Sequence, residues 1–380
     1  MLRIVTKRAI SKSISTCSNP IKQAARSRHS FVDMRSDTLT MPSQEMRQCS
    51  VTAPLGDDVF SEDPTVNELQ RQTADMFRKE DALWLPSGTM ANLCAIQAHC
   101  HERASEIIVG KESHLTLWEG GNLSTIAAVH PRQIMEDPFG KLDLEEVRNV
   151  WRSDNDDHFA KTSLVCIENS HNMMGGSVLD KKYIDELGKV ASELGIKVHI
   201  DGARIFNASV SLNIPVGELC QSADSVSICL SKGLGAPIGS MLVGSKEFIR
   251  LARRARKRMG GGTRQVGVVA AMGKYALDNN IERLALDHQR AKYMAKTLYE
   301  AGFYQPQEGD VSTNIVYFGL PEYCNLSIEE FVRVLKDDYG VLVGYGYSKG
   351  GRLFRACTHL DVTEDEVRHV TETLLSVARS

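Results

Sequence analysis

The chain lacks several features that would assign it to a familiar class at once. No apolar run reaches the roughly 18 residues that a helix needs to cross a membrane. No G-x-G-x-x-G follows a first strand, and the formal net charge is only −3 over 380 residues. These absences argue against a membrane protein, a nicotinamide-binding Rossmann enzyme and a nucleic-acid partner. The 42% hydrophobic and 24% charged content suits a globular protein with one larger and one smaller domain.

Paired cysteine motifs are also absent. The nine cysteines are scattered, none stands in a C-x-x-C spacing, and several lie within apolar runs. This distribution is typical of reduced thiols in the core of a protein from a reducing compartment.

Acidic residues are missing from the first 30 positions, which contain seven arginines or lysines and six serines. An arginine-rich and serine-rich leader without acids is typical of a mitochondrial transit peptide. We therefore predict a transit peptide over residues 1–30 and a location in the mitochondrial matrix. The alternative is a disordered tail on a cytosolic protein.

Residues 198–239 carry the strongest chemical signal. An apolar strand ends in Asp201, a helix follows, and a second apolar strand over residues 225–230 leads to Lys232 in a turn rich in glycine and proline. A lysine can hold the aldehyde of pyridoxal phosphate as a Schiff base, and an acid can keep the pyridine nitrogen protonated. Taken alone, Asp201 could instead cap a helix or bind a ribose, and Lys232 could be solvated. A β-α-β pattern brings the carboxyl ends of both strands to one crevice, which favours the cofactor site.

A phosphate cradle is predicted where a short apolar strand over residues 82–85 turns into a helix that begins at about Met90. Ser87, Gly88 and Thr89 form that turn. The free N–H groups and the positive dipole end of a helix N-terminus suit a phosphate dianion. The alternative is a simple helix cap by Ser87 or Thr89.

The alternation of strand-like and helical segments predicts an α/β fold with a mostly parallel sheet covered on both faces. We expect a cofactor-binding large domain with an N-terminal arm over residues 31–275 and a small C-terminal α+β domain over residues 276–380. Turn formers and carboxylates over residues 53–64 predict a loop. The expected strands cover residues 82–85, 106–109, 125–129, 163–167, 197–200, 225–230, 314–318, 341–344 and 353–356, and the expected helices cover residues 65–77, 181–194, 263–299, 328–336 and 364–378.

Several short motifs follow one another in a fixed order: DMRSDTLTMPS, GDDVFSEDPTVNELQ, LPSGTMAN, KESHLTLWEGG, CIENSHNMMGG, VHIDGARIFNA, CLSKGLGAPIGS and GGGTRQVG. In these motifs the chain resembles the low-specificity L-threonine aldolase family of fold-type I pyridoxal phosphate enzymes, from about residue 32 to residue 378. The resemblance implies aldol cleavage of L-threonine or L-allo-threonine to glycine and acetaldehyde, with pyridoxal 5'-phosphate as cofactor.

The resemblance also assigns catalytic roles. Lys232 would carry the cofactor, and Asp201 would pair with its pyridine nitrogen. His114 would stack on the ring and handle the proton of the substrate hydroxyl. His158 would be a second histidine near that hydroxyl. No metal ligand is expected.

Binding roles follow from the same resemblance. Arg204 and Arg355 would clamp the α-carboxylate of the substrate, because an arginine fork makes two parallel charge-assisted hydrogen bonds, and Arg204 would also contact the cofactor. Ser36 would add a hydroxyl to the same carboxylate. Lys257 and Arg264 would reach the cofactor phosphate from a neighbouring subunit, which implies a homo-oligomer: a dimer that completes each site, in a family that is commonly tetrameric.

Two interpretations stay open at this point. Asp201, Lys232 and an arginine clamp are shared across the fold, so another fold-type I enzyme, such as an aminotransferase or a β-eliminating lyase, is an alternative, as is a non-catalytic relative that binds the cofactor. The basic run over residues 250–258 is either a solvated helix face or a site for an anion.

Overall fold

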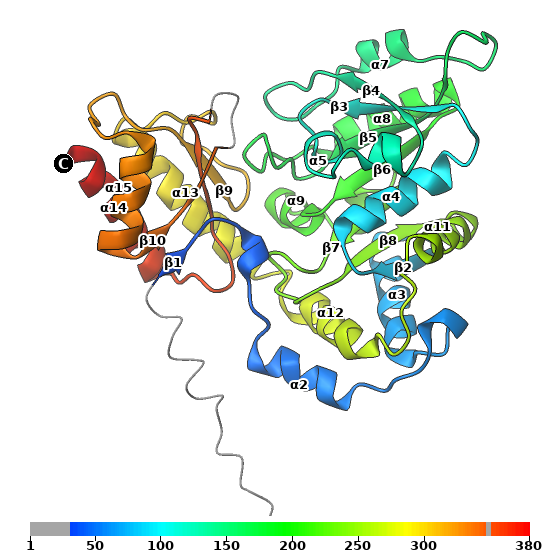
Figure 1. Ribbon diagram of the computed structural model, residues 1–380, viewed down its shortest axis with the longest axis horizontal. Coiled ribbons are helices and arrows are strands. Elements are labelled where there is room, and N and C mark those ends of the chain that lie inside the picture. The colour runs from blue at the N-terminus through cyan, green and yellow to red at the C-terminus, as the bar shows by residue number, and fades with distance from the viewer. Residues whose placement is uncertain (1–30, 347–350) are drawn as a thin grey trace, which may run out of the picture.

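A seven-stranded sheet forms the centre of the larger lobe (Figure 1). The computed structural model describes residues 31–346 and 351–380. The strand order is β2-β8-β7-β6-β5-β3-β4, and only β8 runs antiparallel to its neighbours. The strands are β2 (Asp81–Leu85), β3 (Ser105–Gly110), β4 (His130–Ile134), β5 (Lys161–Glu168), β6 (Lys197–Gly202), β7 (Ser225–Cys229) and β8 (Ser240–Gly244). The predicted α/β fold with a mostly parallel sheet is confirmed.

Consecutive apolar residues bury both faces of this sheet. In β2, Ala82 and Trp84 belong to one hydrophobic cluster, whereas Leu83 and Leu85 belong to another. Since successive side chains of a strand point to opposite faces, helices must cover both sides. One face is covered by α4 (Gly88–His99) and α11 (Lys246–Arg258), and the other by α3 (Pro64–Phe77), α8 (Lys181–Leu194), α9 (Ile205–Leu212), α10 (Val216–Leu219) and α12 (Gly267–Asn279).

The smaller lobe has its own core and includes the start of the described chain. Its antiparallel sheet has the order β11-β12-β9, while β1 (Val32–Asp33) pairs in parallel with β10. Met34 is buried in this core, so the N-terminal strand lies with the C-terminal elements, as Figure 1 shows. The remaining elements are α13 (Leu284–Glu300), β9 (Ile315–Phe318), α14 (Ile328–Tyr339), β10 (Val341–Leu342), β11 (Gly344–Tyr345), β12 (Phe354–Cys357) and α15 (Glu364–Arg379).

Two local features differ from the sequence-based expectations. The helix expected over residues 263–299 is divided into α12 and α13 by a break at residues 280–283. The strand expected over residues 125–129 is wrong: the short helix α6 (Asn122–Thr125) ends there, and the amides of Ala127 and Val129 bond back to Asn122 and Leu123. The strand is β4, five residues further on, which pairs only with β3 and is largely exposed. Its sequence HPRQI lacks an apolar pattern because a half-solvated edge strand does not need one. The predicted leader, residues 1–30, lies outside the described residues.

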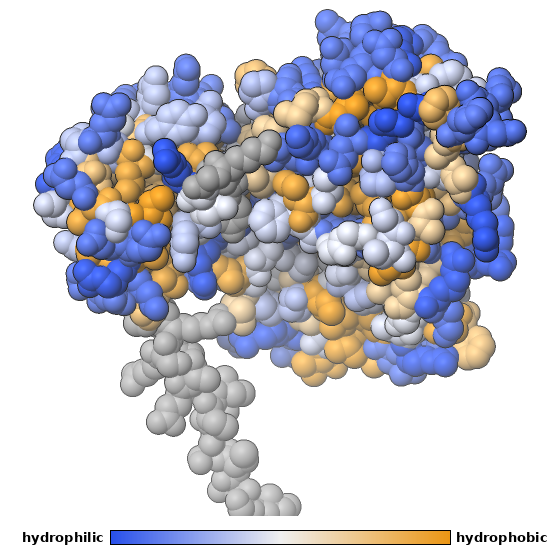
Figure 2. Space-filling view, turned by 45° about the horizontal axis from the view of Figure 1, so that its top comes forward, coloured by the Kyte–Doolittle hydropathy of each residue, from blue (hydrophilic) through white to orange (hydrophobic). Residues whose placement is uncertain are grey.

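No helix among residues 31–346 and 351–380 is both long enough and apolar enough to span a bilayer. Exposed apolar side chains do occur on α2 (Gln44–Thr52), on the loop after it and at the start of α12; they are Val51, Leu55, Phe60 and Val268. Figure 2 shows apolar residues gathered at the lower edge of the larger lobe, between polar surroundings.

A buried ion pair anchors the loop expected over residues 53–64. This segment contains one short 3₁₀ helix, Asp58–Phe60, and is otherwise irregular. The side chains of Asp58 and Arg256 are 0% and 3% exposed, and Arg256 Nη2 lies 2.7 Å from Asp58 Oδ2. Arg256 Nη1 also donates to the carbonyl of Trp84 at 2.7 Å. The loop is therefore fixed to α11 and β2 by one guanidinium.

Asp58→Ala should destabilise the fold by about 3–5 kcal/mol, because it leaves the guanidinium of Arg256 buried without its counter-charge. Urea unfolding followed by circular dichroism measures the loss. The neighbouring Asp57→Ala is the matched control, since Asp57 pairs with the half-exposed Arg264, and its unfolding midpoint should move much less. Equal midpoints for the two variants would contradict the role given to the buried pair.

Candidate active site

A pocket of about 260 Å³ opens at the carboxyl ends of β2, β6 and β7. Because parallel strands end at the same edge of a sheet, segments far apart in the chain meet there. Its lining consists of Pro86, Ser87, Gly88, Thr89, Asn92, His114, Glu119, Asp201, Ala203, Cys229, Ser231, Lys232, Pro237 and Ile238. Six residues predicted from the sequence, namely Ser87, Gly88, Thr89, His114, Asp201 and Lys232, are thereby brought together.

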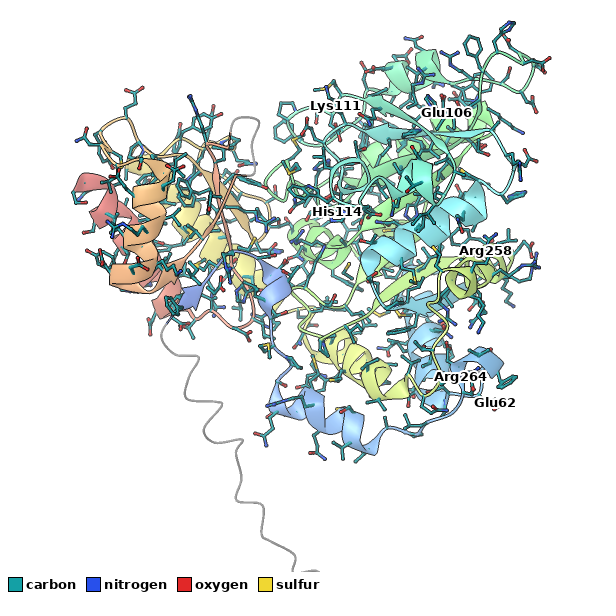
Figure 3. All side chains as sticks on the ribbon, in the orientation of Figure 1. Glu62, Glu106, Lys111, His114, Arg258 and Arg264 are labelled. Atoms are coloured by element: carbon teal, nitrogen blue, oxygen red, sulfur yellow. The ribbon has the colours of Figure 1, made fainter. Side chains whose placement is uncertain are left out.

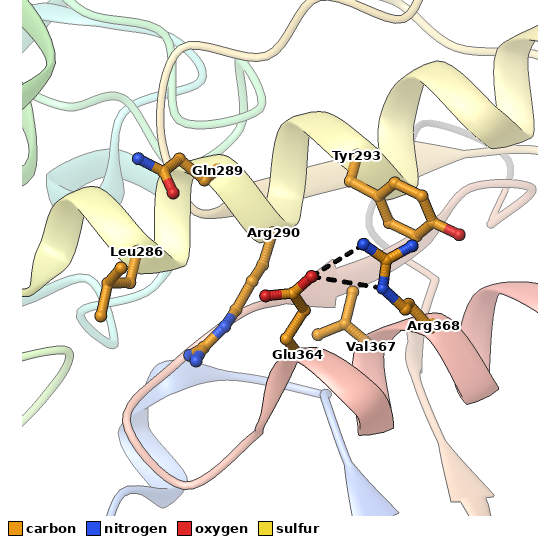
Figure 4. Close-up of a pocket in the computed structure, with 7 residues that line it drawn as sticks. All are labelled: Leu286, Gln289, Arg290, Tyr293, Glu364, Val367 and Arg368. Carbon is orange, nitrogen blue, oxygen red and sulfur yellow. Dashed lines mark hydrogen bonds and ion pairs between the residues drawn. The ribbon is translucent and has the colours of Figure 1, made fainter.

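Another hollow, of about 230 Å³, lies between α13 and α15 on the smaller lobe (Figure 4). Its charged groups already have partners: Arg368 pairs with Glu364 at 2.7 Å, and Arg290 Nη1 donates to the carbonyl of Val362 at 3.0 Å. The hollow therefore presents paired charges rather than reactive groups, and the pocket at the sheet edge is the better candidate.

The turn after β7 places Lys232 in the pocket. The amide of Leu230 bonds to the carbonyl of Gly239, and the amide of Gly235 bonds to the carbonyl of Lys232. Gly235 and Gly239 have φ angles of 80° and 111°, which side-chain-bearing residues rarely adopt. Thr40 Oγ1 also donates to the carbonyl of Lys232 at 2.8 Å. The glycines of the motif thus form a tight turn that fixes the lysine backbone.

Asp201 lies at the end of β6 and is 3% exposed. Its Oδ1 accepts a hydrogen bond from the amide of Ala203 at 3.2 Å, and its Oδ2 accepts one from Asn92 Nδ2 at 2.9 Å. These two bonds set the orientation of the carboxylate beside Lys232.

The N-terminus of α4 forms the wall opposite this carboxylate. Ser87 caps the helix, because its Oγ accepts from the amide of Met90 at 3.2 Å, and the predicted contact of this turn with a phosphate stays a prediction. The first-turn amides of Gly88 and Thr89 have no acceptor within the helix and stay available for an anion. A Cβ atom on Gly88 would lie only 2.7 Å from Cys229 Sγ, so the close approach of the helix to β7 requires glycine.

His114 begins the short helix α5 (His114–Leu117) and points its ring toward the pocket. Its Nδ1 lies 3.0 Å from Glu119 Oε1, and its backbone amide donates to Glu168 at 2.7 Å. Burial alone lowers the pKa of His114, but the hydrogen bond to Glu119 and the charges of Asp201 and Glu168 outweigh it, so the pKa is raised. Glu119 was not selected from the sequence, although it stands in the same motif, KESHLTLWEGG.

His158, predicted to lie near the substrate hydroxyl, does not line the pocket of its own chain, and its contact with the substrate stays a prediction. His158 precedes the N-terminal end of β5, its side chain is 88% exposed, and its Nδ1 pairs with Asp156. The pocket lies at the other end of the strand, about 25 Å away for eight residues. His171, which follows β5 at the correct end, is buried 3.4 Å from Glu136. The motif CIENSHNMMGG contains this histidine, which does not line the pocket.

Arg204 has a partner that local sequence patterns did not reveal. Its Nε and Nη2 donate to Asp37 at 2.8 and 2.6 Å, and both side chains are buried. Burial tends to raise the pKa of Asp37, but Arg204 and, more weakly, Lys232 hold it well below its usual value. The fork expected to clamp the substrate carboxylate is therefore engaged with the N-terminal segment, and Arg204 does not line the pocket of Lys232 and Asp201.

Arg355 and the residues around Ser36 lie next to each other on the smaller lobe. Arg355 Nη2 donates to the carbonyl of Arg35 at 3.0 Å, and its Nη1 donates to Asn172 Oδ1 at 2.9 Å. Ser36 Oγ accepts from the amide and the hydroxyl of Thr38. Arg355 thus bridges the smaller lobe and the loop after β5, although neither it nor Ser36 lines the pocket itself.

Lys257 and Arg264 do not line the pocket of their own chain. Arg264 Nη1 pairs with Asp57 at 2.8 Å, and Figure 3 places Arg264 beside Glu62, well away from His114. The predicted contact of both residues with the phosphate site of a neighbouring subunit stays a prediction.

Donor atoms of His114, Glu119 and Asp201 lie within 4.8 Å of one another, which is close enough for a shared metal ion. Both carboxylates already accept hydrogen bonds, from Asn92 and, for Glu119, also from the His114 ring. The two carboxylates of the cluster are therefore already engaged, by neighbouring donors and by the His114 ring.

The residues fit pyridoxal phosphate. Lys232 offers an amine, Asp201 offers a buried carboxylate, and the N-terminus of α4, kept free of a side chain at Gly88, offers amides to a phosphate. Aldehyde, ring nitrogen and phosphate each have a chemically suitable group in one pocket.

Comparison with known proteins agrees with this site. The family described as beta-eliminating lyase matches residues 33–320. The low-specificity L-threonine aldolase of Escherichia coli (strain K12) is 41% identical over 340 residues, 90% of this chain and 97% of that protein. Low-specificity L-threonine aldolase 1 of Arabidopsis thaliana is 40% identical over 339 residues, 89% of this chain and 94% of that protein. The structure of the Leishmania major threonine aldolase has a TM-score of 0.77 at 18% identity, with 90% of this chain and 98% of that chain covered. The chain belongs to the low-specificity L-threonine aldolase family of pyridoxal phosphate-dependent lyases.

Proposed function

We propose that this protein cleaves L-threonine and L-allo-threonine to glycine and acetaldehyde, in a pyridoxal phosphate-dependent aldol cleavage of the Cα–Cβ bond. The observation that carries the proposal is the meeting of Lys232, Asp201 and His114 in one pocket. The relatives that align with most of this chain are named as threonine aldolases, which supports the same reaction. The reaction makes the protein part of threonine catabolism and glycine formation.

Lys232, Asp201 and the amides of Gly88 and Thr89 are the groups that would hold the cofactor. Pyridoxal phosphate, when bound, draws the electrons of the breaking bond into its ring. Asp201, a carboxylate held by Ala203 and Asn92, would pair with the ring nitrogen of the cofactor. A fixed negative charge at this position stabilises the developing charge without rearrangement of the site.

His114 is the group placed to take the hydroxyl proton of the substrate. Its Nδ1 is engaged by Glu119, so Nε2 is the ring nitrogen that remains for the substrate. Hydrogen bonding to Glu119 fixes the ring in this orientation and favours the protonated form, which is the form that His114 reaches after it accepts the proton.

Arg355, with Ser36 beside it, is the group that would bind the α-carboxylate: its partners, the Asn172 amide and the Arg35 carbonyl, are neutral, whereas the fork of Arg204 is held by the charged Asp37. Fixing that carboxylate would orient the substrate on the cofactor and so select the bond that breaks. The pair of Arg204 and Asp37 instead lies beside Lys232 and holds the N-terminal segment near the site.

A homo-oligomer, with a dimer completing each site and a tetramer as the whole assembly, is part of the proposal. Its support is the exposed apolar group Val51, Leu55, Phe60 and Val268 near Arg264, together with the basic residues at the end of α11. A surface of this kind suits a second copy of the chain. The arginine-rich leader supports a location in the mitochondrial matrix.

Lys232→Ala should lower acetaldehyde release by at least about 1,000-fold, because the residue that carries the cofactor covalently is lost. A coupled acetaldehyde assay with threonine and no keto acid measures this loss, and the absorbance spectrum reports the change in bound cofactor. Lys246→Ala, on the surface at the start of α11, is the control and should behave as wild type. Full activity of Lys232→Ala would refute the assignment, and a wild-type reaction that requires a keto acid would indicate an aminotransferase.

Arg355→Lys should raise KM for threonine and lower kcat/KM by about 10- to 100-fold, because an ammonium cannot reproduce the bidentate contact with a carboxylate. Steady-state kinetics with threonine and allo-threonine test this expectation. Arg333→Lys, an exposed position on α14, serves as the control. An unchanged KM in Arg355→Lys would mean that another residue binds the α-carboxylate.

Arg264→Ala and Lys232→Ala should complement each other when both chains are made in one cell. If Arg264 serves the neighbouring subunit, a mixed dimer contains one site with an intact Lys232 and an intact Arg264. Random assembly then restores about a quarter of the wild-type sites. The control is a mixture of the two variants that are purified separately and combined just before the assay. No recovery in co-expressed chains would contradict a contact across subunits, and full activity of Arg264→Ala alone would place Arg264 outside the active site.

A further inference from the structure

Asn92, the residue on α4 that donates to Asp201, lies between the two carboxylates of the pocket. Its side chain is 2% exposed and makes four hydrogen bonds. The Nδ2 atom donates to Glu119 Oε1 and to Asp201 Oδ2, both at 2.9 Å. The Oδ1 atom accepts from Ser227 Oγ at 2.7 Å and lies 3.2 Å from His199 Nε2. All four hydrogen-bonding positions of the amide are used.

The direction of every bond in this network follows from the carboxylates. A carboxylate only accepts, so the amide nitrogen of Asn92 must face Asp201 and Glu119, and its oxygen must face His199. His199 then donates from Nε2 and accepts at Nδ1 from Ser225 Oγ, 2.8 Å away.

The network continues to the C-terminal end of α4, at His99. Ser225 in turn accepts from His99 Nε2 at 2.7 Å. Burial lowers the pKa of His199 to about 4 and that of His99 to about 3, so both rings are neutral, as this pattern requires. Along this network each residue donates a hydrogen bond to the next one: His99 to Ser225, Ser225 to His199, His199 to Asn92, and Asn92 to the two carboxylates.

The geometry points to Asn92 as a positioning residue: its amide holds Asp201 toward the ring nitrogen of the cofactor and holds Glu119 toward His114 at the same time. This inference rests on the proposed function. Two carboxylates that share one donor atom repel each other unless positive dipoles lie between them. A lysine or arginine in this place would offset that repulsion but would also neutralise Asp201, which must face the cationic ring nitrogen. A neutral amide supplies two N–H dipoles and leaves both negative charges available.

Other groups around His114 do not replace this contact. Glu168 accepts from the backbone amide of His114 rather than from its ring, and Lys232 is the cation across the pocket. Asn122 holds the other oxygen of Glu119 at 3.0 Å. Asn92 is thus the residue, among those that the structure describes, whose single side chain contacts both carboxylates.

Asn92→Asp and Asn92→Ala test the inference in the holoenzyme. We expect the dissociation constant of pyridoxal phosphate to rise about 10-fold and kcat per bound cofactor to fall about 10- to 100-fold. Loss of a residue that orients a catalytic group through a hydrogen bond has effects of about this size. KM for threonine should stay within about 3-fold, because Asn92 orients other residues and does not hold the substrate carboxylate. Asn67→Ala, an exposed asparagine on α3, is the control for asparagine loss.

A purely structural role would lower the yield of folded protein or its melting temperature but leave kcat per bound cofactor unchanged. Folded Asn92 variants with wild-type cofactor affinity and wild-type kcat would overturn the inference. If neither variant folds, Ser227→Ala replaces them: it removes one bond to Asn92 Oδ1 and should give a smaller change in the same direction, and wild-type values would again refute the role.

The cofactor measurement separates this inference from the proposed function. A wild-type protein that binds pyridoxal phosphate but releases no acetaldehyde would refute the proposed reaction. The affinity for the cofactor in the Asn92 variants would still decide whether the amide positions Asp201.

Discussion

The parallel pairing of β6 with β7 is the constraint on which the site depends. The pairing sets Asp201 opposite Ser227, and the chain leaves β7 only a few residues before Lys232. The backbone positions of Asp201 and Lys232, the two residues that would hold the cofactor, are thus fixed by hydrogen bonds in the centre of a sheet that is buried on both faces. A rigid sheet edge holds catalytic groups more accurately than a loop would, because its position is determined by two hydrophobic cores.

The N-terminal segment connects this edge to the smaller lobe. Asp37 accepts from Arg204 of the larger lobe and from Asn314 Nδ2 of the smaller lobe, and β1 pairs with β10. The buried carboxylate of Asp37 accepts hydrogen bonds from both side chains. It therefore links the N-terminal segment to both lobes. The two lobes therefore meet at the site through specific polar contacts, while each lobe keeps a separate apolar core.

Local sequence patterns were sufficient to predict the site residues at strand ends. They were insufficient to predict which residues pair with one another across the fold. Lys232, Asp201 and the Ser87 turn follow directly from apolar strands that end in polar residues. The partner of Arg204 stands 167 positions away, and no periodicity reports such a contact. His158 and His171 both flank β5, and only the strand direction tells which one lies at the end of the strand nearer the pocket. The edge strand β4 escaped notice because its solvated residues carry no apolar pattern.

The sequence patterns thus indicated most of the course of the backbone but did not indicate which charged and polar side chains pair with one another. Asn92 illustrates the point: in sequence it is one polar residue in the otherwise apolar helix α4, where burial without partners would be costly. Such a residue predicts a polar network but not its members, because Glu119, Asp201, Ser227 and His199 come from four other segments. The sheet brings these segments together, and the amide then satisfies them all. A site of this kind is specified twice, once by the apolar residues that form the sheet and once by the hydrogen bonds that orient its charges.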